Sequence, residues 1–400
     1  MESIYITGAG VVSAIGIGKT ETLTALQTGQ SGIRTMRFLS STHQELPVGE
    51  VPLSNEELTQ RFGLELTTDV NRTALLGRLA LREALEEARL SGSDLKTVPF
   101  ISATTVGGMD LREKYHANEA NCDETFARIA AHQCGDNTEM IAAPFGEFAS
   151  TGTLSTACSS ATNAIITGAN MIRLGLAETV VVGGSECLSK FHLNGFNALM
   201  ILDQEPCRPF DETRAGLNLG EGAAFLVLET AKAAMKRGVH PRYQLSGYGN
   251  ACDAFHQTAS SPEGEGAFRA MTEALQLAGL TISDIDYINA HGTATPNNDE
   301  SESAAIKRVF GNHLPPVSST KGFTGHTTSA SGSIEAVFCL LAMEYQFLPP
   351  NIHFHTPMAN GIIPVTTTKP QKPIQHVMSN AFGFGGNDSS IILSLHNAHD

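Results

Sequence analysis

Hydrophobic positions along the chain follow two periodicities. Short apolar runs bounded by glycine or polar residues are typical of strands that a sheet buries on both faces. A longer stretch, residues 71–90, places Leu81, Leu85 and Ala88 at positions i, i+4 and i+7, and this spacing predicts an amphipathic helix. Because strands and helices alternate, the pattern indicates an α/β protein. The first strands are expected at residues 4–7, 99–103, 178–183 and 223–228.

Two distant stretches share one motif. "YITGAGVVSAIG" near the start and "YQLSGYGNACDAFH" later both run apolar, Ser or Thr, Gly, any residue, Gly, and they align Gly8 with Gly247. "STACSSA" and "SSTKGFTGH" each precede a helix of small residues. We therefore expect an internal duplication, with halves at residues 1–242 and 243–400. Such turns also recur by chance in α/β proteins, so the first repeat alone leaves that alternative open.

Composition excludes several classes of partner. The net charge is −15 and no Lys/Arg cluster occurs, so neither nucleic acid nor an anionic membrane is an expected target. The start "MESIYITGAGVV" reads as a strand rather than a signal peptide, and no run is long enough to span a membrane. The seven cysteines are scattered without a CxxC pair, which favours a reducing, cytoplasmic location.

Three stretches resemble ligand sites but fail on spacing. "GIGKTE" lacks the first glycine of a phosphate-binding loop, because Ser13 stands there. "GAGVVS" ends in serine where the dinucleotide motif requires glycine or alanine. His353 and His355 lie on one side of a predicted strand without a third ligand at suitable spacing, so no metal site is expected.

Cys158 lies in the uncharged stretch "LSTACSSATNAI". The helix predicted over residues 159–173 carries no charge before Arg173, so we expect it to be buried. Cys158 precedes its first turn, where free N–H groups and the helix dipole favour a thiolate and should lower the thiol pKa. Cys158 is therefore a candidate nucleophile, although a free cysteine is also a favoured small core residue.

His291 follows a predicted strand in "YINAHGTATPNND". The C-terminal end of such a strand faces the crevice where α/β proteins bind ligands. Thr293 and Thr295 lie two residues apart on one side of an extended chain, which suits a ligand rich in amides. An ordinary loop histidine is the alternative.

A second cluster of candidates lies in "VSSTKGFTGHTTSASGSIEAV". Lys321 and Glu335 can form a buried ion pair, since either charge would be costly to bury alone; two unrelated surface charges are the alternative. His326 precedes a small-residue helix as Cys158 does, and the positive helix end should keep its imidazole neutral. In "NAFGFGGND", two phenylalanines interleave with glycines in a tight loop, which is either a gate or a packed turn.

Together these segments resemble the condensing enzymes of the thiolase superfamily, and more narrowly the 3-oxoacyl-[acyl-carrier-protein] synthases, or ketosynthases. "YITGAGVVSAIG", "CRPFDETRAGLNLGEGAAFLVLE" and "NAFGFGGND" fit this family in the same order, so the resemblance covers essentially the whole chain. It implies an α/β fold of the thiolase-like, duplicated, five-layer αβαβα type.

The resemblance also implies an activity, the decarboxylative Claisen condensation of an acyl thioester with malonyl-carrier protein in fatty-acid or related polyene and polyketide elongation. Cys158 would carry the acyl chain, and His291 and His326 would serve decarboxylation and condensation. Lys321 matches the family's lysine and Glu335 its partner. The backbone N–H groups of Cys158 and Phe384 would form an oxyanion hole.

Substrate contacts are implied in the same way. Thr293 and Thr295 would bind the phosphopantetheine amides, Phe384 resembles a gating phenylalanine with Phe382 beside it, and Val106 matches a position that lines the acyl pocket. No metal or organic cofactor is expected, because the substrates arrive on the phosphopantetheine of an acyl carrier protein. Candidate docking residues for that carrier are Arg61, Arg72 and Arg208.

A homodimer is expected, with a heterodimer containing a ketosynthase-like partner as the alternative. An accessory chain-length factor would usually lack the reactive cysteine, and a coenzyme A-dependent thiolase would need a second one near the C-terminal glycines. The family commonly closes "GFGGTN", whereas Asn387 and Asp388 stand here. Asp388 is expected to add a charge beside the gate. This difference from the common "GFGGTN" ending slightly favours a specialised pathway over housekeeping fatty-acid synthesis.

Overall fold

One mixed β-sheet organises the chain. In the computed structural model, which describes residues 2–63, 70–116 and 133–396, its strands follow the order β4-β3-β5-β6-β1-β7-β11-β10-β8-β9, and β2 pairs with β1. The strands predicted from the apolar runs are present as β1, β3, β5 and β6. The strands are β1 (Tyr5–Ser13), β2 (Gly16–Ile17), β3 (Pro99–Ala103), β4 (Ser150–Leu154), β5 (Thr179–Glu186), β6 (Gly222–Glu229), β7 (Tyr243–Cys252), β8 (Tyr287–Asn289), β9 (Val317–Ser318), β10 (His376–Gly383) and β11 (Asn387–Leu395).

The helices lie between these strands. The amphipathic pattern at 71–90 forms α3, whose first turn is capped by Asn71 because its Oδ1 accepts a hydrogen bond from the Ala74 N–H. The helices are α1 (Lys19–Thr28), α2 (Asn55–Phe62), α3 (Arg72–Glu87), α4 (Met109–His116), α6 (Cys134–Ala142), α7 (Ser160–Arg173), α8 (Lys190–Ala198), α9 (Ala231–Lys236), α10 (Glu265–Ala278), α11 (Pro296–Phe310), α12 (Lys321–Thr324) and α13 (Ser331–Tyr345).

The two parts of the sheet repeat one connectivity. The two-residue strand β2 is left out of this comparison. Reading inward from each edge, the order β4-β3-β5-β6-β1 and the order β9-β8-β10-β11-β7 then both place the third, second, fourth, fifth and first strand of their own half. The two first strands, β1 and β7, meet at the centre and pair at only two positions. This arrangement agrees with the expected duplication. The boundary between residues 242 and 243 stays a prediction, although β7 begins at Tyr243.

The aligned glycines Gly8 and Gly247 have the same structural role. A Cβ on Gly8 would lie 2.1 Å from the carbonyl oxygen of Ala84 in α3, and a Cβ on Gly247 would lie 2.2 Å from that of Ala274 in α10. Each glycine therefore lets a helix approach the first strand of its half at backbone contact. The sequence repeat records this shared packing requirement.

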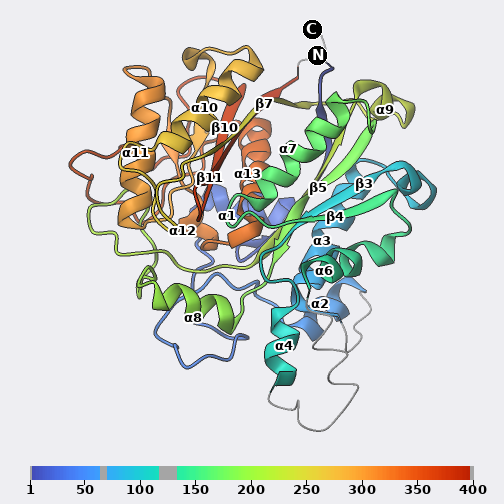
Figure 1. The fold of residues 1–400 in the computed structure, drawn as a ribbon, viewed down its shortest axis with the longest axis horizontal. Helices are drawn as coiled ribbons and strands as arrows, with labels where there is room; N and C mark the ends of the chain where they lie inside the picture. Colours follow the sequence, from blue (N-terminus) through green and yellow to red (C-terminus); the bar gives the residue numbers. More distant parts are fainter. Residues whose placement is uncertain (1, 64–69, 117–132, 397–400) are drawn as a thin grey trace.

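The helices form three layers around the two parts of the sheet (Figure 1). α3 covers the outer face of β1, β6 and β5, α10 covers the outer face of β7 and β11, and α7 and α13 pack together between the halves. With the two parts of the sheet, these layers give the expected thiolase-like, five-layer αβαβα fold. The residues from 110 to 140 include α4 and α6, and the remainder of that stretch lies outside the described residues.

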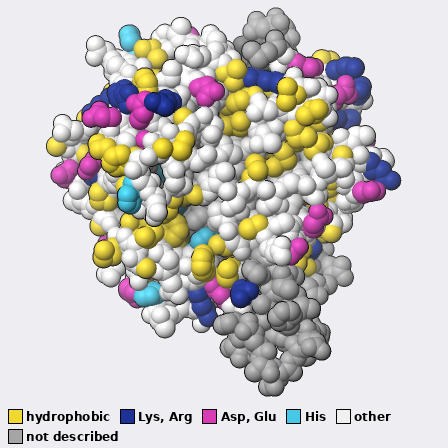
Figure 2. Space-filling model, viewed as in Figure 1, with side chains coloured by type: hydrophobic (Ala, Val, Ile, Leu, Met, Phe, Trp, Pro, Cys, Tyr) yellow, Lys and Arg dark blue, Asp and Glu magenta, His cyan; other side chains and the backbone are white. Residues whose placement is uncertain are grey.

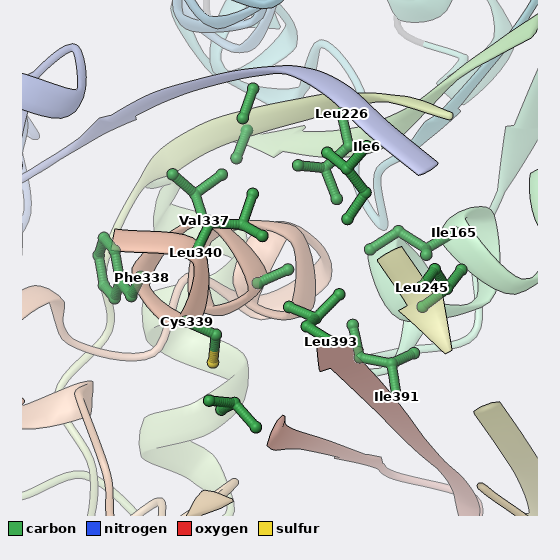
Figure 3. Close-up of a cluster of buried hydrophobic side chains, with 14 of the residues drawn as sticks. Ile6, Ile165, Leu226, Leu245, Val337, Phe338, Cys339, Leu340, Ile391 and Leu393 are labelled. Atoms are coloured by element: carbon green, nitrogen blue, oxygen red, sulfur yellow. The ribbon is translucent and has the colours of Figure 1, made fainter. Parts of the chain in front are cut away.

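The central helix α13 is buried along almost its whole length, and most of its side chains are apolar. It is nevertheless short, and among the described residues no helix is both long and apolar enough to cross a membrane. Figure 3 shows its side chains between strands of both halves. Those labelled are Val337, Phe338, Cys339 and Leu340 from α13, Ile165 from α7, Ile6 and Leu226 from the first half, and Leu245, Ile391 and Leu393 from the second.

Candidate active site

Cys158 lies immediately before α7, in a short segment held under backbone strain. Ala157 adopts a φ of 53°, a conformation that residues other than glycine rarely occupy. The Ser160 hydroxyl accepts a hydrogen bond from the Thr156 N–H and donates one to the Ala157 carbonyl, which fixes the bend. Cys158 is 5% exposed, so the bend presents its sulfur to a buried space rather than to solvent.

The two predicted histidines meet this sulfur. His291 follows β8 and His326 follows α12, and their rings are 5.4 Å apart in an edge-on arrangement. His326 Nε2 lies 3.0 Å from Cys158 Sγ. One ligand-type atom of each residue lies within 4.8 Å of the others, and all three residues are buried. We call Cys158, His291 and His326 the Cys–His–His cluster.

The predicted ion pair of Lys321 and Glu335 is present behind this cluster. Lys321 Nζ donates to Glu335 Oε1 at 2.6 Å, and both side chains are almost completely buried. Lys321 Nζ also lies 3.4 Å from His291 Nδ1. An ammonium group can only donate, so Nδ1 accepts and the proton of the neutral ring stays on Nε2.

Both imidazoles are held neutral. Burial lowers the pKa of His291 and of His326 well below the usual value, and the charge of Lys321 lowers both further. The direction agrees with the expectation for His326, but burial rather than the helix end is the main cause. His326 Nδ1 lies 3.0 Å from the hydroxyl of Ser331, which can donate to it and leave the Nε2 proton facing the sulfur.

The expected lowering of the Cys158 pKa is wrong. Burial raises the pKa of this thiol to about 11, although Lys321 and the backbone N–H groups of Phe384 and Cys158 act in the opposite direction. These groups therefore offset only part of the cost of burying a negative charge on the sulfur. The resting residue is a thiol.

A cavity of about 320 Å³ leads to the cluster. Phe382 packs its ring 5.7 Å from His291, and Phe384 stacks on Phe196 of α8 at 5.8 Å. The hydroxyls of Thr293 and Thr295 lie 2.8 Å apart on the cavity wall, as their spacing predicts. Val106 is buried in the turn after β3 and is absent from the described lining, so its place in an acyl pocket stays a prediction.

The cluster also has the spacing of a three-ligand metal site. The ammonium group of Lys321, 3.4 Å from His291 Nδ1, places a positive charge beside it and disfavours a bound cation. The expectation that no metal is used stays a prediction with this electrostatic support.

Family models match both parts of the chain. Residues 1–234 match the beta-ketoacyl synthase N-terminal domain, and residues 243–355 match the beta-ketoacyl synthase C-terminal domain. The chain belongs to the beta-ketoacyl synthase family. This ketosynthase is accordingly an acyl-transferring condensing enzyme of fatty-acid or polyketide synthesis.

Relatives align over nearly the full length. The 3-oxoacyl-[acyl-carrier-protein] synthase 1 of Haemophilus influenzae is 31% identical, covering 99% of this chain and 100% of its own. The corresponding synthase 2 of Staphylococcus aureus is 32% identical over 98% and 97%. Among solved structures, the ishigamide ketosynthase/chain length factor has a TM-score of 0.91 at 29% identity, covering 99% of this chain and 100% of that one. A ketosynthase in complex with its chain length factor from Xenorhabdus doucetiae has a TM-score of 0.81 at 30% identity, over 99% and 98%.

Two residues at the site of this ketosynthase are not predicted by the sequence. Glu302 of α11 accepts hydrogen bonds from the backbone N–H groups of His291 and Gly292, and so fixes the histidine loop. The only sequence feature that points to Glu302 is its acidic side chain on a helix, and residue spacing alone does not show that this side of the helix is buried. Phe196 reaches the mouth of the cavity from α8, and no local pattern marks it.

Two expectations about charge are corrected. Arg72 is buried, and its guanidinium donates to Glu221 and Asn55, so it is not available as a surface docking residue. Asp388 is also buried, and burial together with Asp253 and Glu302 raises its carboxyl pKa to about 8. It therefore adds no charge beside Phe384 at neutral pH.

The raised pKa of Cys158 predicts its reaction with iodoacetamide. Between about pH 7 and 10, the rate of carboxamidomethylation at Cys158 should rise about tenfold per pH unit without a plateau, because the thiolate fraction does so. Peptide mass spectrometry measures this rate residue by residue. A small-molecule thiol, which levels off above a pKa of about 8.5, is the control. A plateau for Cys158 below about pH 9 would contradict the assignment.

Proposed function

We propose that this ketosynthase extends an acyl chain on Cys158 by two carbons taken from malonyl-carrier protein. The observation that carries the proposal is the Cys–His–His cluster itself, with Cys158 Sγ 3.0 Å from His326 Nε2 and the His291 ring 5.4 Å from that of His326. One nucleophile and two neutral N–H donors in one buried cavity suit a reaction that passes through an acyl-enzyme and then an enolate.

The first step is acyl transfer. The Cys158 sulfur attacks the carbonyl carbon of the acyl-carrier thioester, and the negative charge develops on the carbonyl oxygen. The proton of the Cys158 thiol is transferred to the carrier sulfur, which leaves as a thiol. We expect the backbone N–H groups of Cys158 and Phe384 to donate to the carbonyl oxygen. In support, both groups act on the Cys158 sulfur and lower its pKa. Collapse of the intermediate expels the thiol of the carrier and leaves a thioester on Cys158.

The second step forms the carbon–carbon bond. Malonyl-carrier protein loses CO2, and the electron pair of the broken bond forms an enolate whose oxygen accepts from Nε2–H of His291 and of His326. A carboxylate could not stabilise this charge, whereas neutral imidazoles can. The enolate carbon attacks the Cys158 thioester, the thiolate of Cys158 leaves, and a 3-oxoacyl-carrier product is released. The thiolate takes up one proton from solvent, which restores the resting thiol.

We further propose that this chemistry needs no metal or organic cofactor and takes place in the cytoplasm. Every charge that develops in the two steps has a partner among the described residues, so no additional Lewis acid or electron carrier is required by the mechanism. The six described cysteines are free thiols, as expected in a reducing compartment.

The test separates the two half-reactions. Cys158→Ala should lower acyl transfer from acyl-carrier protein by at least about a thousandfold, because no other described cysteine lines the cavity. His291→Ala should retain acyl transfer but lose CO2 release from malonyl-carrier protein. Single-turnover mass spectrometry of the enzyme and trapped CO2 measure the two rates.

Cys134→Ala is the matched control, since Cys134 is a free cysteine on α6, away from the cavity, and this variant should behave as wild type. Chain extension that survives Cys158→Ala would exclude the proposed acyl-enzyme.

The carrier protein must sit at the mouth of the cavity to deliver its arm, and that mouth has an apolar rim. Leu199 lines the cavity and is 43% exposed, and the adjacent Met200 is 88% exposed. Figure 2 shows that hydrophobic side chains are exposed at several places in this view. Arg61 and Arg208 form ion pairs with Glu21 and Asp203; the Arg61 pair is exposed and therefore weak, so Arg61 stays a predicted docking residue beside the apolar rim. We infer that the carrier contacts the Leu199–Met200 rim through an apolar surface.

Met200→Asp should lower kcat/KM for acyl-carrier protein about tenfold and leave kcat/KM for the same acyl group on N-acetylcysteamine unchanged, because the small thioester does not touch the rim. Met235→Asp on α9 is the matched control, since Met235 is also exposed, at 59%, but does not line the cavity, and α9 lies on the opposite side of the view from α8 (Figure 1). Equal losses with both substrates would place Met200 in the reaction itself and overturn the docking assignment.

We also propose that the protein dimerises through β4, the edge strand of the first half. Its Ser150 and Thr151 are exposed, and Leu174 and Leu176 beyond the adjoining helix α7 are 72% and 68% exposed. An uncovered edge strand beside apolar side chains favours pairing with a second copy. Sedimentation of the protein alone should give twice the 42.4 kDa chain mass. A monomer that forms a dimer only after a chain length factor is added would contradict the homodimer. The Xenorhabdus doucetiae ketosynthase is in complex with such a factor.

A further inference from the structure

The two backbone donors of the proposed oxyanion hole come from separate segments of the chain. Cys158 precedes α7, whereas Phe384 lies in the turn between β10 and β11. Oxyanion stabilisation requires both donors at hydrogen-bond distance from one oxygen atom, so a shift of about 1 Å between the segments would weaken it strongly. Some contact must therefore keep the distance between the two segments constant.

The segments touch directly at Gly383. A Cβ at this position would lie 2.8 Å from the Thr156 carbonyl oxygen and 3.2 Å from the Ser159 hydroxyl, so only glycine allows this approach. The close packing brings the turn against the residues on either side of Cys158. A backbone contact of this kind sets a minimum distance but does not fasten the segments together.

Asn387, at the start of β11, connects the two segments through hydrogen bonds. Its Oδ1 accepts from Asn163 Nδ2 of α7 at 2.7 Å and from Asn250 Nδ2 of β7 at 3.0 Å. The Ser159 hydroxyl lies 2.7 Å from the same oxygen and 2.8 Å from the Thr156 carbonyl, so its proton can serve either. One amide oxygen thus joins the exit of the Phe384 turn to the first turn of α7.

The donor side of this contact is itself fixed. Asn163 Nδ2 also donates to the Thr156 hydroxyl at 2.8 Å, and Asn163 Oδ1 accepts from Asn250 Nδ2 at 3.0 Å and from the Ser389 hydroxyl at 2.8 Å. With its amide group bound at both ends, Asn163 cannot swing away from Asn387 without breaking several hydrogen bonds. The network is therefore a stiff connection between α7, β7 and β11.

We propose that Asn387 is a positioning residue that holds the Phe384 turn against the N-terminus of α7 and so sets the spacing of the two oxyanion donors. The inference rests on the proposed function. It also gives a role to one departure from the usual "GFGGTN" ending. An amide oxygen reaches one bond further from the backbone than a threonine hydroxyl, which allows it to accept from two chain segments at once.

The experiment compares the two half-reactions in Asn387→Ala. Acyl transfer to Cys158 uses the oxyanion hole and should slow at least tenfold, whereas CO2 release from malonyl-carrier protein without an acyl donor uses the two histidines and should stay within twofold. Single-turnover mass spectrometry and trapped CO2 give the two rates. Asn360→Ala, at an exposed asparagine, is the matched control and should change neither.

Asn163→Ala completes a double-mutant cycle. Because both substitutions remove the same contact, the double variant should be little slower in acyl transfer than Asn387→Ala alone. If Asn387→Ala does not fold, Asn387→Thr should also slow acyl transfer more than CO2 release, with a smaller difference between the two rates.

Parallel loss of both half-reactions, fully additive losses, or unchanged acyl transfer would each overturn the role of Asn387. Failure of the wild-type protein to become acylated at Cys158 would instead overturn the proposed function, so the two failures are distinguishable.

Discussion

The active site depends on one buried cation. Lys321 lies in the protein interior with its ammonium group bound to Glu335 and facing His291 Nδ1, and such a charge is stable there only because a carboxylate balances it. The pair has no net charge, but its positive end faces the histidines. It therefore lowers the pKa of both rings, orients the tautomer of His291, and partly offsets the burial that keeps Cys158 a thiol.

Duplication explains how residues so far apart in sequence meet. Each half places its third strand and the buried helix that follows at the same position, so α7 and α13 pack against each other in the middle layer. Cys158 precedes the first of these helices, and His326 precedes the second by a short turn. The same packing that fills the core between the two halves of the sheet brings a sulfur and an imidazole to 3.0 Å.

Local pattern was sufficient for the elements. It gave only candidates for the reacting residues, whose roles came from the family resemblance, and it was insufficient for their charge states. The period of α3, the apolar runs of β3 and β6 and the small-residue character of α7 are all local properties, and each element is present. The thiol pKa of Cys158 depends on burial, which is a property of the whole fold. The same reason explains why Arg72 was expected to be a docking residue and Asp388 to add a charge beside the gate: each is buried by the fold.

The site must be buried to keep its histidines neutral, and it must also hold His291 in a fixed position to stabilise an enolate. The loop that carries His291 to Thr295 has no regular structure of its own, so its backbone N–H groups need other acceptors. Glu302 accepts from His291 and Gly292, and Asp299 accepts from Ala294 and from Phe210. Burial raises the pKa of Glu302 to about 7 and of Asp299 to about 6, so these acids hold the loop at a cost in stability at neutral pH. Because the loop is already fixed, its donors need not reorganise when charge develops on the substrate, which lowers the free energy of the transition state. The stability cost of the buried acids is the cost of this fixed loop.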